Sequence, residues 1–466
     1  MPYRVPFIEI LSDNPYKNDV LNRKDTVEFL AGLIERAGGP FVLALDSPYG
    51  TGKSTLVEML RTVLTGKDFQ CVYFNAWQFD YAVDPLVAMV SALDEVTRSE
   101  SESNVGLKAH MGTLRKVTTS VAKRSVVAAV KAATLGILDL EPAMEKVAAD
   151  LAGDSTQDLV EAFQRESKQL SKFRDELEAV VKELPGIGKQ QTLVFFVDEL
   201  DRCRPTFAIE LLERIKHLFD VPNIAFVLSV DMRQLEASVA AVYGSGIDAP
   251  EYLRKFIDLE FGLPKVSGVA FTELLLKKFD LDEAFAARSH SELRYDRDHF
   301  VSFFSKLADV CKLALRSQER CIARLKVVLD QTPSDHYLDP ILVALLIVLR
   351  MKNKGLFSGL ASGLSAPGDV VEYLKEMQGG KALMEDHAGA VMESMLIACD
   401  PDRKRGEATR AYLQEMAASP DIPEEVRGDY ARRLDMVQNV FRGMRRNTPS
   451  IPGIARKVDI VAGIRD

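Results

Sequence analysis

Two short groups of residues combine glycines, a lysine, hydroxyls and carboxylates at spacings suited to chemistry on an anion. The first is the run GTGKST at residues 50–55, which follows an apolar segment at 41–45 and opens a helical pattern. Glycines let successive backbone N–H groups converge on anionic oxygens, and a helix N-terminus adds its own free donors. An apolar strand, a Gly-rich turn and a helix in this order predict a phosphate-binding loop. Taken alone, the run also fits a turn that binds nothing.

The side chains of this loop have distinct expected roles. Lys53 is expected to neutralise the β- and γ-phosphates of a nucleotide, Ser54 to ligate Mg²⁺, and Thr55 to lie near the α-phosphate. Ser47 stands where the common pattern G-x-x-x-x-G-K-[ST] has its first glycine, and we interpret the segment as a variant loop stiffened by Pro48. The residues expected to contact the nucleotide are Ser47, Pro48, Tyr49, Gly50, Thr51, Gly52, Lys53, Ser54 and Thr55.

The second group is a pair of acids at the end of the apolar run at 193–197. A strand that ends there would deliver Asp198 to the Mg²⁺ shell beside Ser54. Glu199 is then placed to orient or deprotonate an attacking water. Without the phosphate loop, the same residues fit a buried strand that runs into an acidic turn. Together with the loop they predict a site for MgATP.

Further side chains are candidates near the γ-phosphate. Asp231 ends the apolar run at 224–230, where it is placed either to sense the γ-phosphate or to cap the next helix. Arg202 follows the acids closely and is expected to pair with an acid or with the nucleotide of a neighbouring subunit. Arg254, and Arg320 on an amphipathic helix at 313–329, are candidates to stabilise charge on the γ-phosphate; for Arg320 a solvated basic face is the alternative.

Strands and helices in alternation must position these groups. Apolar runs at 41–45, 193–197 and 224–230 predict buried strands of one parallel sheet, the segment at 71–75 predicts another strand, and 256–263 is the expected last strand. From about 99 to 188 the sequence has no strand pattern and a helical periodicity instead. Helical patterns also dominate beyond Pro264, where we expect a buried helix at 340–349 and a loop at 351–369. We therefore expect a lead-in and first half of the core at 1–98, a helical insertion at 99–190, the second half of the core at 191–264, a helical lid at 265–335 and a C-terminal helical region at 336–466.

Composition narrows the classes of function. The net charge of −9 argues against a protein that coats DNA, and five scattered cysteines without a C-x-x-C pair predict reduced thiols and a cytoplasmic location. No apolar run is long enough to span a bilayer, and Mg²⁺ is the only metal implied. The most basic part of the sequence lies in the last hundred residues and is the best candidate for contact with nucleic acid, although it contains no known nucleic-acid-binding motif. Its basic residues are Arg432, Arg433, Arg442, Arg445, Arg446, Arg456 and Lys457.

With these residues in place, the chain resembles the KAP-family P-loop NTPases over about residues 15–330. The resemblance rests on the blocks SPYGTGKST, FNAWQFD, FFVDELDRCRP, VLSVDMRQL and YLRKFIDLEFGLP. It implies an α/β fold of the P-loop NTPase (ASCE) type, a three-layer α/β/α parallel sheet with a long helical insertion and a helical lid and C-terminal region. Many relatives carry membrane helices in the insertion, which this sequence lacks. The family usually has Asp-Asp where this chain has Asp198-Glu199, and Glu199 suits hydrolysis.

The resemblance also implies a biological setting. Prokaryotic relatives often occur in mobile-element and phage-defence systems. We therefore expect an ATPase that hydrolyses MgATP to drive or time assembly and conformational change, as a homo-oligomer with a partner effector protein. A slow nucleotide switch or scaffold that recruits an effector is the alternative, followed by a P-loop kinase that acts on a small molecule or polynucleotide.

Overall fold

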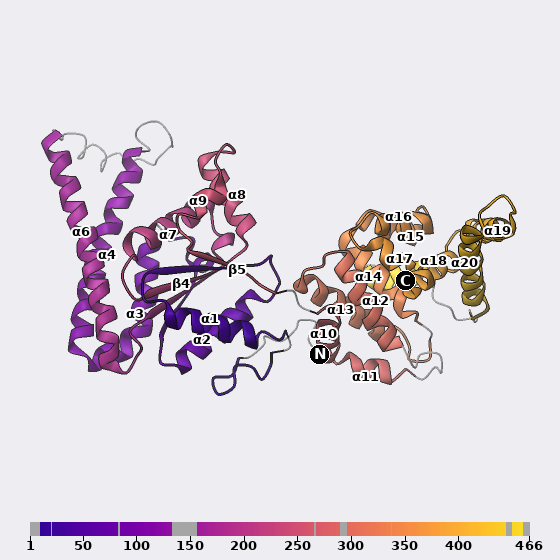
Figure 1. Ribbon diagram of the computed structural model, residues 1–466, viewed down its shortest axis with the longest axis horizontal. Helices are drawn as coiled ribbons and strands as arrows, with labels where there is room; N and C mark the ends of the chain where they lie inside the picture. Colours follow the sequence, from indigo (N-terminus) through magenta and orange to yellow (C-terminus); the bar gives the residue numbers. More distant parts are fainter. Residues whose placement is uncertain are drawn as a thin grey trace. The chain divides into compact units, whose positions relative to one another are not determined.

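The computed structural model describes residues 10–19, 21–82, 84–132, 156–264, 267–288, 296–336, 338–443 and 450–459 (Figure 1). These residues form two compact units, 10–264 and 267–459. The finer division into five segments stays a prediction.

The first unit is built on a five-stranded parallel sheet. Its strands follow the order β2-β3-β4-β1-β5, so two strands of the N-terminal half flank β3 and β4. The three apolar runs at 41–45, 193–197 and 224–230 became the central strands, whose two faces are both covered, and such burial favours continuous apolar sequence. The strands are β1 (Phe41–Asp46), β2 (Gln70–Asn75), β3 (Leu193–Asp198), β4 (Ile224–Val230) and β5 (Leu259–Gly262).

The last strand is shorter than the sequence predicts. The segment at 256–263 predicts a full strand, but β5 pairs with β1 only from Leu259 onward. The N–H groups of Phe256 and Ile257 donate to the Leu253 carbonyl in a turn, and Asp258 Oδ2 accepts the Val42 N–H at 2.8 Å. A side chain therefore takes the place of a backbone carbonyl at the start of the ladder.

Helices cover both faces of the sheet and complete three layers. Leu43, Val194 and Val227 point to one face and pack in a single apolar cluster with α1 (Lys24–Arg36) and α2 (Lys53–Gly66). The alternate strand residues point to the other face, as their period of two requires. There they pack with α3 (Pro85–Ser103), α7 (Pro205–Leu218), α8 (Met232–Tyr243) and α9 (Ala249–Leu253).

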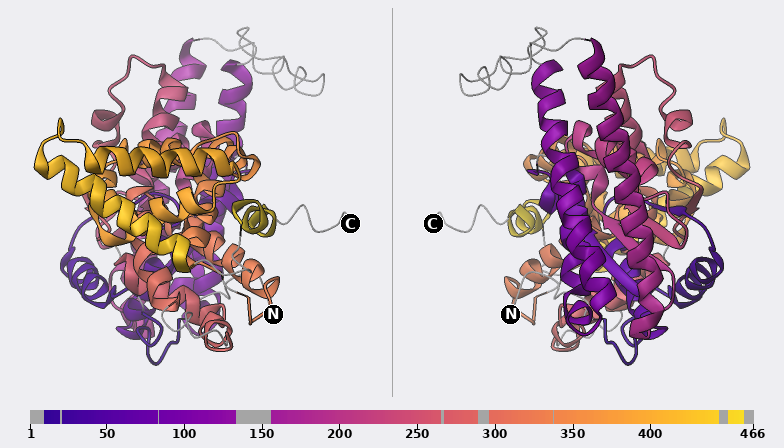
Figure 2. Two further views of the ribbon diagram at one scale, coloured as in Figure 1. Left: turned by 90° about the vertical axis from the view of Figure 1, so that its right-hand side faces the viewer. Right: turned by 90° about the vertical axis from the view of Figure 1, so that its left-hand side faces the viewer.

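Two long helices lie between β2 and β3 in the sequence. They are α4 (Val105–Ala132) and α6 (Thr156–Glu183), and they run side by side away from the sheet (Figures 1 and 2). Near the sheet their apolar residues join the same core cluster as α3 and α7, including Leu114 and Phe173. No helix among the described residues is both long enough and apolar enough to cross a membrane.

The described part of the second unit is helical. The buried helix predicted at 340–349 is confirmed as part of α14, whose apolar run is buried along its length. The loop predicted at 351–369 is wrong, because α15 occupies its centre: Asn353 Oδ1 accepts the Leu356 N–H at 3.0 Å, and Phe357 and Leu360 are buried. The helices are α10 (Gly268–Lys278), α11 (Leu281–Ala286), α12 (Asp296–Val310), α13 (Leu315–Asp330), α14 (Pro340–Lys352), α15 (Lys354–Ser362), α16 (Pro367–Lys375), α17 (Gly380–Glu385), α18 (His387–Ala398), α19 (Arg403–Ala418), α20 (Glu424–Gly443) and α21 (Ile451–Asp459).

Candidate active site

Polar residues end four neighbouring strands at one edge of the sheet. In the strand register, Asn75 lies opposite Asp198, and Asp46 lies opposite Val230, the residue before Asp231. Because all strands are parallel, their carboxyl ends share this edge, which is where open α/β sheets bind ligands. The sequence-predicted acids Asp198 and Asp231 are thus on adjacent strands.

The loop between β1 and α2 turns at its glycines. Gly50 and Gly52 have φ angles of 76° and 87°, a region that glycine adopts without a steric cost. Ser47 is not among the residues with positive φ, so this turn does not require glycine at its first position. Instead the Ser47 hydroxyl donates to Thr51 Oγ1 at 2.6 Å, and Thr51 Oγ1 donates to the Pro48 carbonyl at 2.8 Å. The serine that departs from the common pattern therefore braces the loop.

Lys53 lies inside this loop with only 9% of its surface exposed. Its Nζ atom donates to the carbonyl oxygens of Ser47 and Pro48. Burial lowers the pKa of Lys53, while Asp201, Asp231, Asp198 and Asp46 act in the opposite direction. The ammonium is therefore surrounded by carboxylates, but no direct ion pair with it occurs among the described residues.

The two acids after β3 differ in their surroundings. Asp198 is 3% exposed, and its Oδ2 atom accepts from the Tyr73 hydroxyl at 3.1 Å. Glu199 has a φ of 61°, which is uncommon for a residue with a side chain and turns the chain sharply at the strand tip. Its Oε2 atom accepts from Asn75 Nδ2 at 3.1 Å, and its Oε1 atom pairs with Arg202 Nη1 at 2.6 Å. The expectation that Arg202 pairs with an acid is confirmed.

Two aspartates that the sequence analysis did not single out organise the strand tips. Asp201 is buried, and its Oδ2 atom accepts the backbone N–H of Asp231 at 2.8 Å. Burial raises the pKa of Asp201. Asp46 Oδ1 accepts the Met232 N–H at 2.9 Å and so holds the first turn of α8. Asp231 makes no side-chain cap of its own; its Oδ1 atom contacts Arg233 Nε at 3.4 Å. The capping alternative for Asp231 is therefore wrong.

Aromatic rings surround Arg202. Its guanidinium lies 5.3 Å from the ring centroid of Tyr49 and 5.6 Å from that of Trp77. The Tyr49 hydroxyl donates to the Asp201 carbonyl at 3.0 Å, and burial, followed by the Asp201 charge, raises the pKa of Tyr49 to about 12. Trp77 lies in the short 3₁₀ helix Ala76–Phe79, whose start is capped by Asn75.

Arg23 connects the loop with the end of the sheet. The residue is buried, its Nη1 atom donates to the Pro264 carbonyl at 2.8 Å, and its Nη2 atom to the Thr51 carbonyl at 3.5 Å. Sequence reasoning missed Arg23, and also Tyr73 and Asn75 beside the acids. A polar residue at the tip of a predicted strand was the signal that could have found Asn75 and, likewise, Asp46.

The remaining predicted residues lie on surfaces. Ser54 is exposed and Thr55 half-buried in the first turn of α2. Arg254 pairs with Glu251 at 2.8 Å on the surface of α9, and Arg320 is exposed on α13 in the second unit. A role of either arginine at the γ-phosphate stays a prediction.

The basic C-terminal cluster is partly neutralised by neighbouring groups. Arg432 pairs with Asp429, Arg433 with Glu393, and Lys457 donates to the Thr332 hydroxyl. Arg445 and Arg446 lie outside the described residues. A nucleic-acid surface there stays a prediction.

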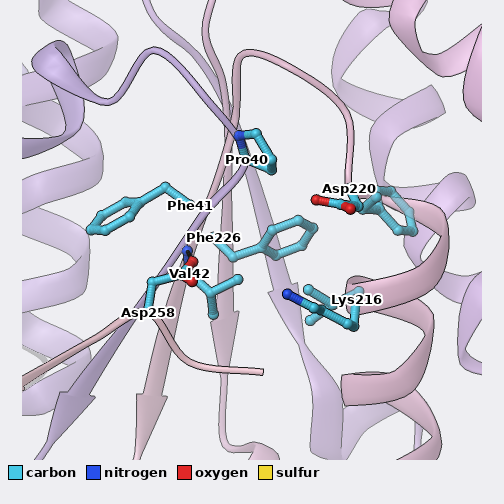
Figure 3. Close-up of a pocket in the computed structure, with 9 residues that line it drawn as sticks. Pro40, Phe41, Val42, Lys216, Asp220, Phe226 and Asp258 are labelled. Carbon is cyan, nitrogen blue, oxygen red and sulfur yellow. Dashed lines mark hydrogen bonds between the residues drawn. The ribbon is translucent and has the colours of Figure 1, made fainter. Parts of the chain in front are cut away.

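A small pocket lies at the opposite edge of the sheet, where β1 and β4 begin (Figure 3). Phe41 and Phe226 line it from the strands, and Lys216 and Asp220 from the end of α7 and the residues after it. Its volume of about 40 Å³ holds roughly one water molecule. This pocket is therefore neither large enough nor placed to hold the nucleotide.

The glycine loop after β1, the acids after β3 and the strand β4 between these two strands define a P-loop NTPase domain, a nucleotide-binding class. The model of the KAP family P-loop domain matches residues 23–330, well over half of the chain, and the chain belongs to this family. No curated protein matches the sequence. Among solved structures, the Aeropyrum pernix ORC2 protein in its ADPNP–ADP complexes is similar over 90% of this chain and 94% of that one, at 14% identity. The TM-score of this match is 0.34.

Proposed function

We propose that the chain binds MgATP and hydrolyses its terminal phosphate bond. The observation that supports this most directly is the placement of Glu199 at the tip of β3, next to Asp198, whose charge acts on Lys53 in the phosphate loop. A water-directing acid beside a metal-binding acid suits hydrolysis, whereas a kinase needs a base aimed at an acceptor group.

The residues of the site suit a triphosphate with Mg²⁺. The loop N–H groups and Lys53 would hold the phosphates, and Ser54 and Asp198 supply the hard oxygen ligands that Mg²⁺ prefers. No group of three or more His, Cys, Asp or Glu residues in the described part of the chain is arranged to hold a metal. A Mg²⁺ ion would thus depend on phosphate oxygens as well as on protein, and when bound it would neutralise charge that develops on them.

The side chains around this site have separable tasks. Lys53 donates to two loop carbonyls, and it would exchange these for phosphate oxygens. Tyr73 orients the Asp198 carboxylate, and Asp201 and Asp46 fix the backbone at the start of α8. Glu199 would hold the attacking water and take its proton.

The decisive experiment compares binding and turnover. Glu199→Gln is expected to lower ATP hydrolysis by roughly 10²–10⁴-fold while nucleotide binding persists, because general-base catalysis contributes about that much. Lys53→Ala is expected to abolish binding. If Lys53→Ala bound ATP as tightly as the parent, the assignment of the site would be wrong. Phosphate transfer to an added acceptor, rather than to water, would favour the kinase alternative.

We further propose that hydrolysis times the assembly of a homo-oligomer with a partner effector, in a setting such as phage defence. The support is the family and the long hairpin of α4 and α6 outside the sheet, which offers surface that nucleotide binding does not use. Particle mass measured with and without nucleotide tests the assembly. Turnover without any change in mass, with or without neighbouring gene products, would contradict it.

A further inference from the structure

Arg202 lies between the phosphate loop and the proposed catalytic acid. Its Nη1 atom pairs with Glu199 Oε1 at 2.6 Å, and the two side chains are 26% and 18% exposed. Its guanidinium also lies over the rings of Tyr49, in the phosphate loop, and Trp77, after β2. One cation is therefore held by partners from three segments of the site, through charge and through the faces of two rings.

This arrangement occupies the carboxylate that hydrolysis needs. Arg202 engages Oε1 of Glu199, and Asn75 donates to Oε2. A carboxylate with both oxygens engaged in this way has fewer lone pairs with which to accept a proton from water. Both oxygens of Glu199 are thus engaged by side chains of the site.

A polyphosphate in the loop would compete for the same cation. A guanidinium binds phosphate oxygens through two parallel hydrogen bonds, and it does so at least as well as it binds a carboxylate. Tyr49 belongs to the loop that would hold the phosphates, so filling this loop acts on a ring over which Arg202 lies. Lys53 is the cation of the loop itself, and the charges of several carboxylates already act on it. A second cation, Arg202, would therefore help to balance the negative charge of a bound triphosphate.

We propose that Arg202 is a nucleotide-responsive latch. It holds Glu199 while the loop is empty and moves to the terminal phosphate when a triphosphate binds, which releases Glu199 to orient water. Arg202 is in this sense a positioning residue for Glu199. The inference rests on the proposed function, because it assigns regulation to the same site.

The chain contains a built-in reporter for this movement. Trp77 is its one tryptophan, and it lies against the Arg202 guanidinium. A non-hydrolysable ATP analogue with Mg²⁺ is expected to change the tryptophan emission of the parent and of Glu199→Gln. Magnesium tripolyphosphate, which has no base, is expected to give the same change. A response to the analogue alone would assign the signal to base stacking and overturn the latch.

Substitution of the latch itself gives the second readout. Arg202→Ala is expected to lose the emission change, whereas Arg204→Ala is the matched control and should keep it, because Arg204 pairs with Asp80 instead. If Arg202→Ala does not fold, Arg202→Lys serves in its place. The lysine cannot stack as a plane or bind phosphate through two bonds, so at least half of the response should be lost. A full response in the folded variant overturns the proposal.

The affinity for the analogue, measured in the parent, the two single variants and the double variant, distinguishes the latch from simple repulsion between Glu199 and the phosphates. Glu199→Gln removes the competitor for Arg202, so the analogue should bind up to about fivefold tighter, the upper end of the range expected for a partly exposed ion pair. In the Arg202→Ala background the same substitution should give no tightening. Equal tightening in both backgrounds would show that only charge repulsion was relieved. If Lys53→Ala abolishes binding while the emission change is independent of Arg202, the latch alone fails and the proposed function stands.

Discussion

The carboxylate of Asp46, at the tip of β1, accepts the backbone N–H of Met232, the first residue of α8, at 2.9 Å. The strand that leads into the phosphate loop therefore also holds the helix that follows β4. The carboxylate of Asp231 makes no cap of its own, and its charge raises the pKa of Lys53 against the effect of burial.

Removal of this cap should destabilise the first unit. Asp46→Ala leaves the buried Met232 N–H without its acceptor and should lower the free energy of unfolding by about 1–2 kcal/mol. Asp46→Asn keeps an acceptor oxygen and is the matched control, with a much smaller expected loss. Denaturant unfolding of the two variants measures the difference, and equal losses would show that charge, not the cap, matters.

Lys53→Ala should not lower the melting temperature of the protein without nucleotide, but it should remove the stabilisation that MgATP gives. Burial lowers the pKa of Lys53, which means that the folded protein disfavours its charge, so loss of this side chain should leave the melting temperature of the nucleotide-free protein unchanged or higher. The increase in melting temperature on addition of MgATP should disappear in the same variant. A large loss of stability without nucleotide would contradict this account of the loop.

Tyr73→Phe should weaken the metal site without unfolding the protein. The Tyr73 hydroxyl donates to Asp198 Oδ2 at 3.1 Å, and loss of an outer hydrogen bond to a metal ligand typically costs roughly 10–100-fold in metal affinity. The Mg²⁺ concentration that supports nucleotide binding should rise accordingly. Tyr243→Phe, which removes a hydroxyl from a surface cluster of α8 and α9, is the control, and an equal effect there would refute the assignment.

The second unit should lose stability as the pH rises. Burial, and then the charge of Asp339, raise the pKa of Asp296 in α12 from 3.8 to about 7. Between these values the folded state keeps a proton that the unfolded chain has released, so the free energy of unfolding falls as the pH rises from about 4 to about 7. The expected loss is on the order of 2–4 kcal/mol.

Asp296→Asn tests this pH dependence directly. The amide is neutral throughout the range, so the variant should lose most of the decline in stability between about pH 4 and pH 7. Unfolding of the parent and the variant at several pH values measures it. A decline of the same size in both would assign the effect to other groups.

The parts of the site that the sequence predicted are those with a local signal. Lys53 and Ser54 follow a glycine pattern, and Asp198 follows a run of apolar residues, so all three could be inferred without knowledge of the fold. The missed partners are distant in sequence: Tyr73 contacts Asp198 across 125 residues, and Asp46 contacts Met232 across 186. Only the order of strands in the sheet brings such residues together.

The errors also have physical causes. The glycines and serines at 351–369 favour a loop, but a capping side chain at Asn353 and two buried apolar residues outweigh their weak helix propensity. Residues 256–263 suit a strand throughout, but the N–H groups of Phe256 and Ile257 donate to the Leu253 carbonyl in a turn, and Asp258 makes the first contacts with β1. Capping and side-chain contacts to the backbone were therefore the missing information, not the apolar pattern.

The buried guanidinium of Arg23 joins two parts of the first unit. It holds the carbonyl of Thr51 and, with its other arm, the carbonyl of Pro264, the last residue of the first unit. The loop that would hold the phosphates and the last residue of the first unit therefore share one hydrogen-bonding partner, although they lie far apart in the sequence.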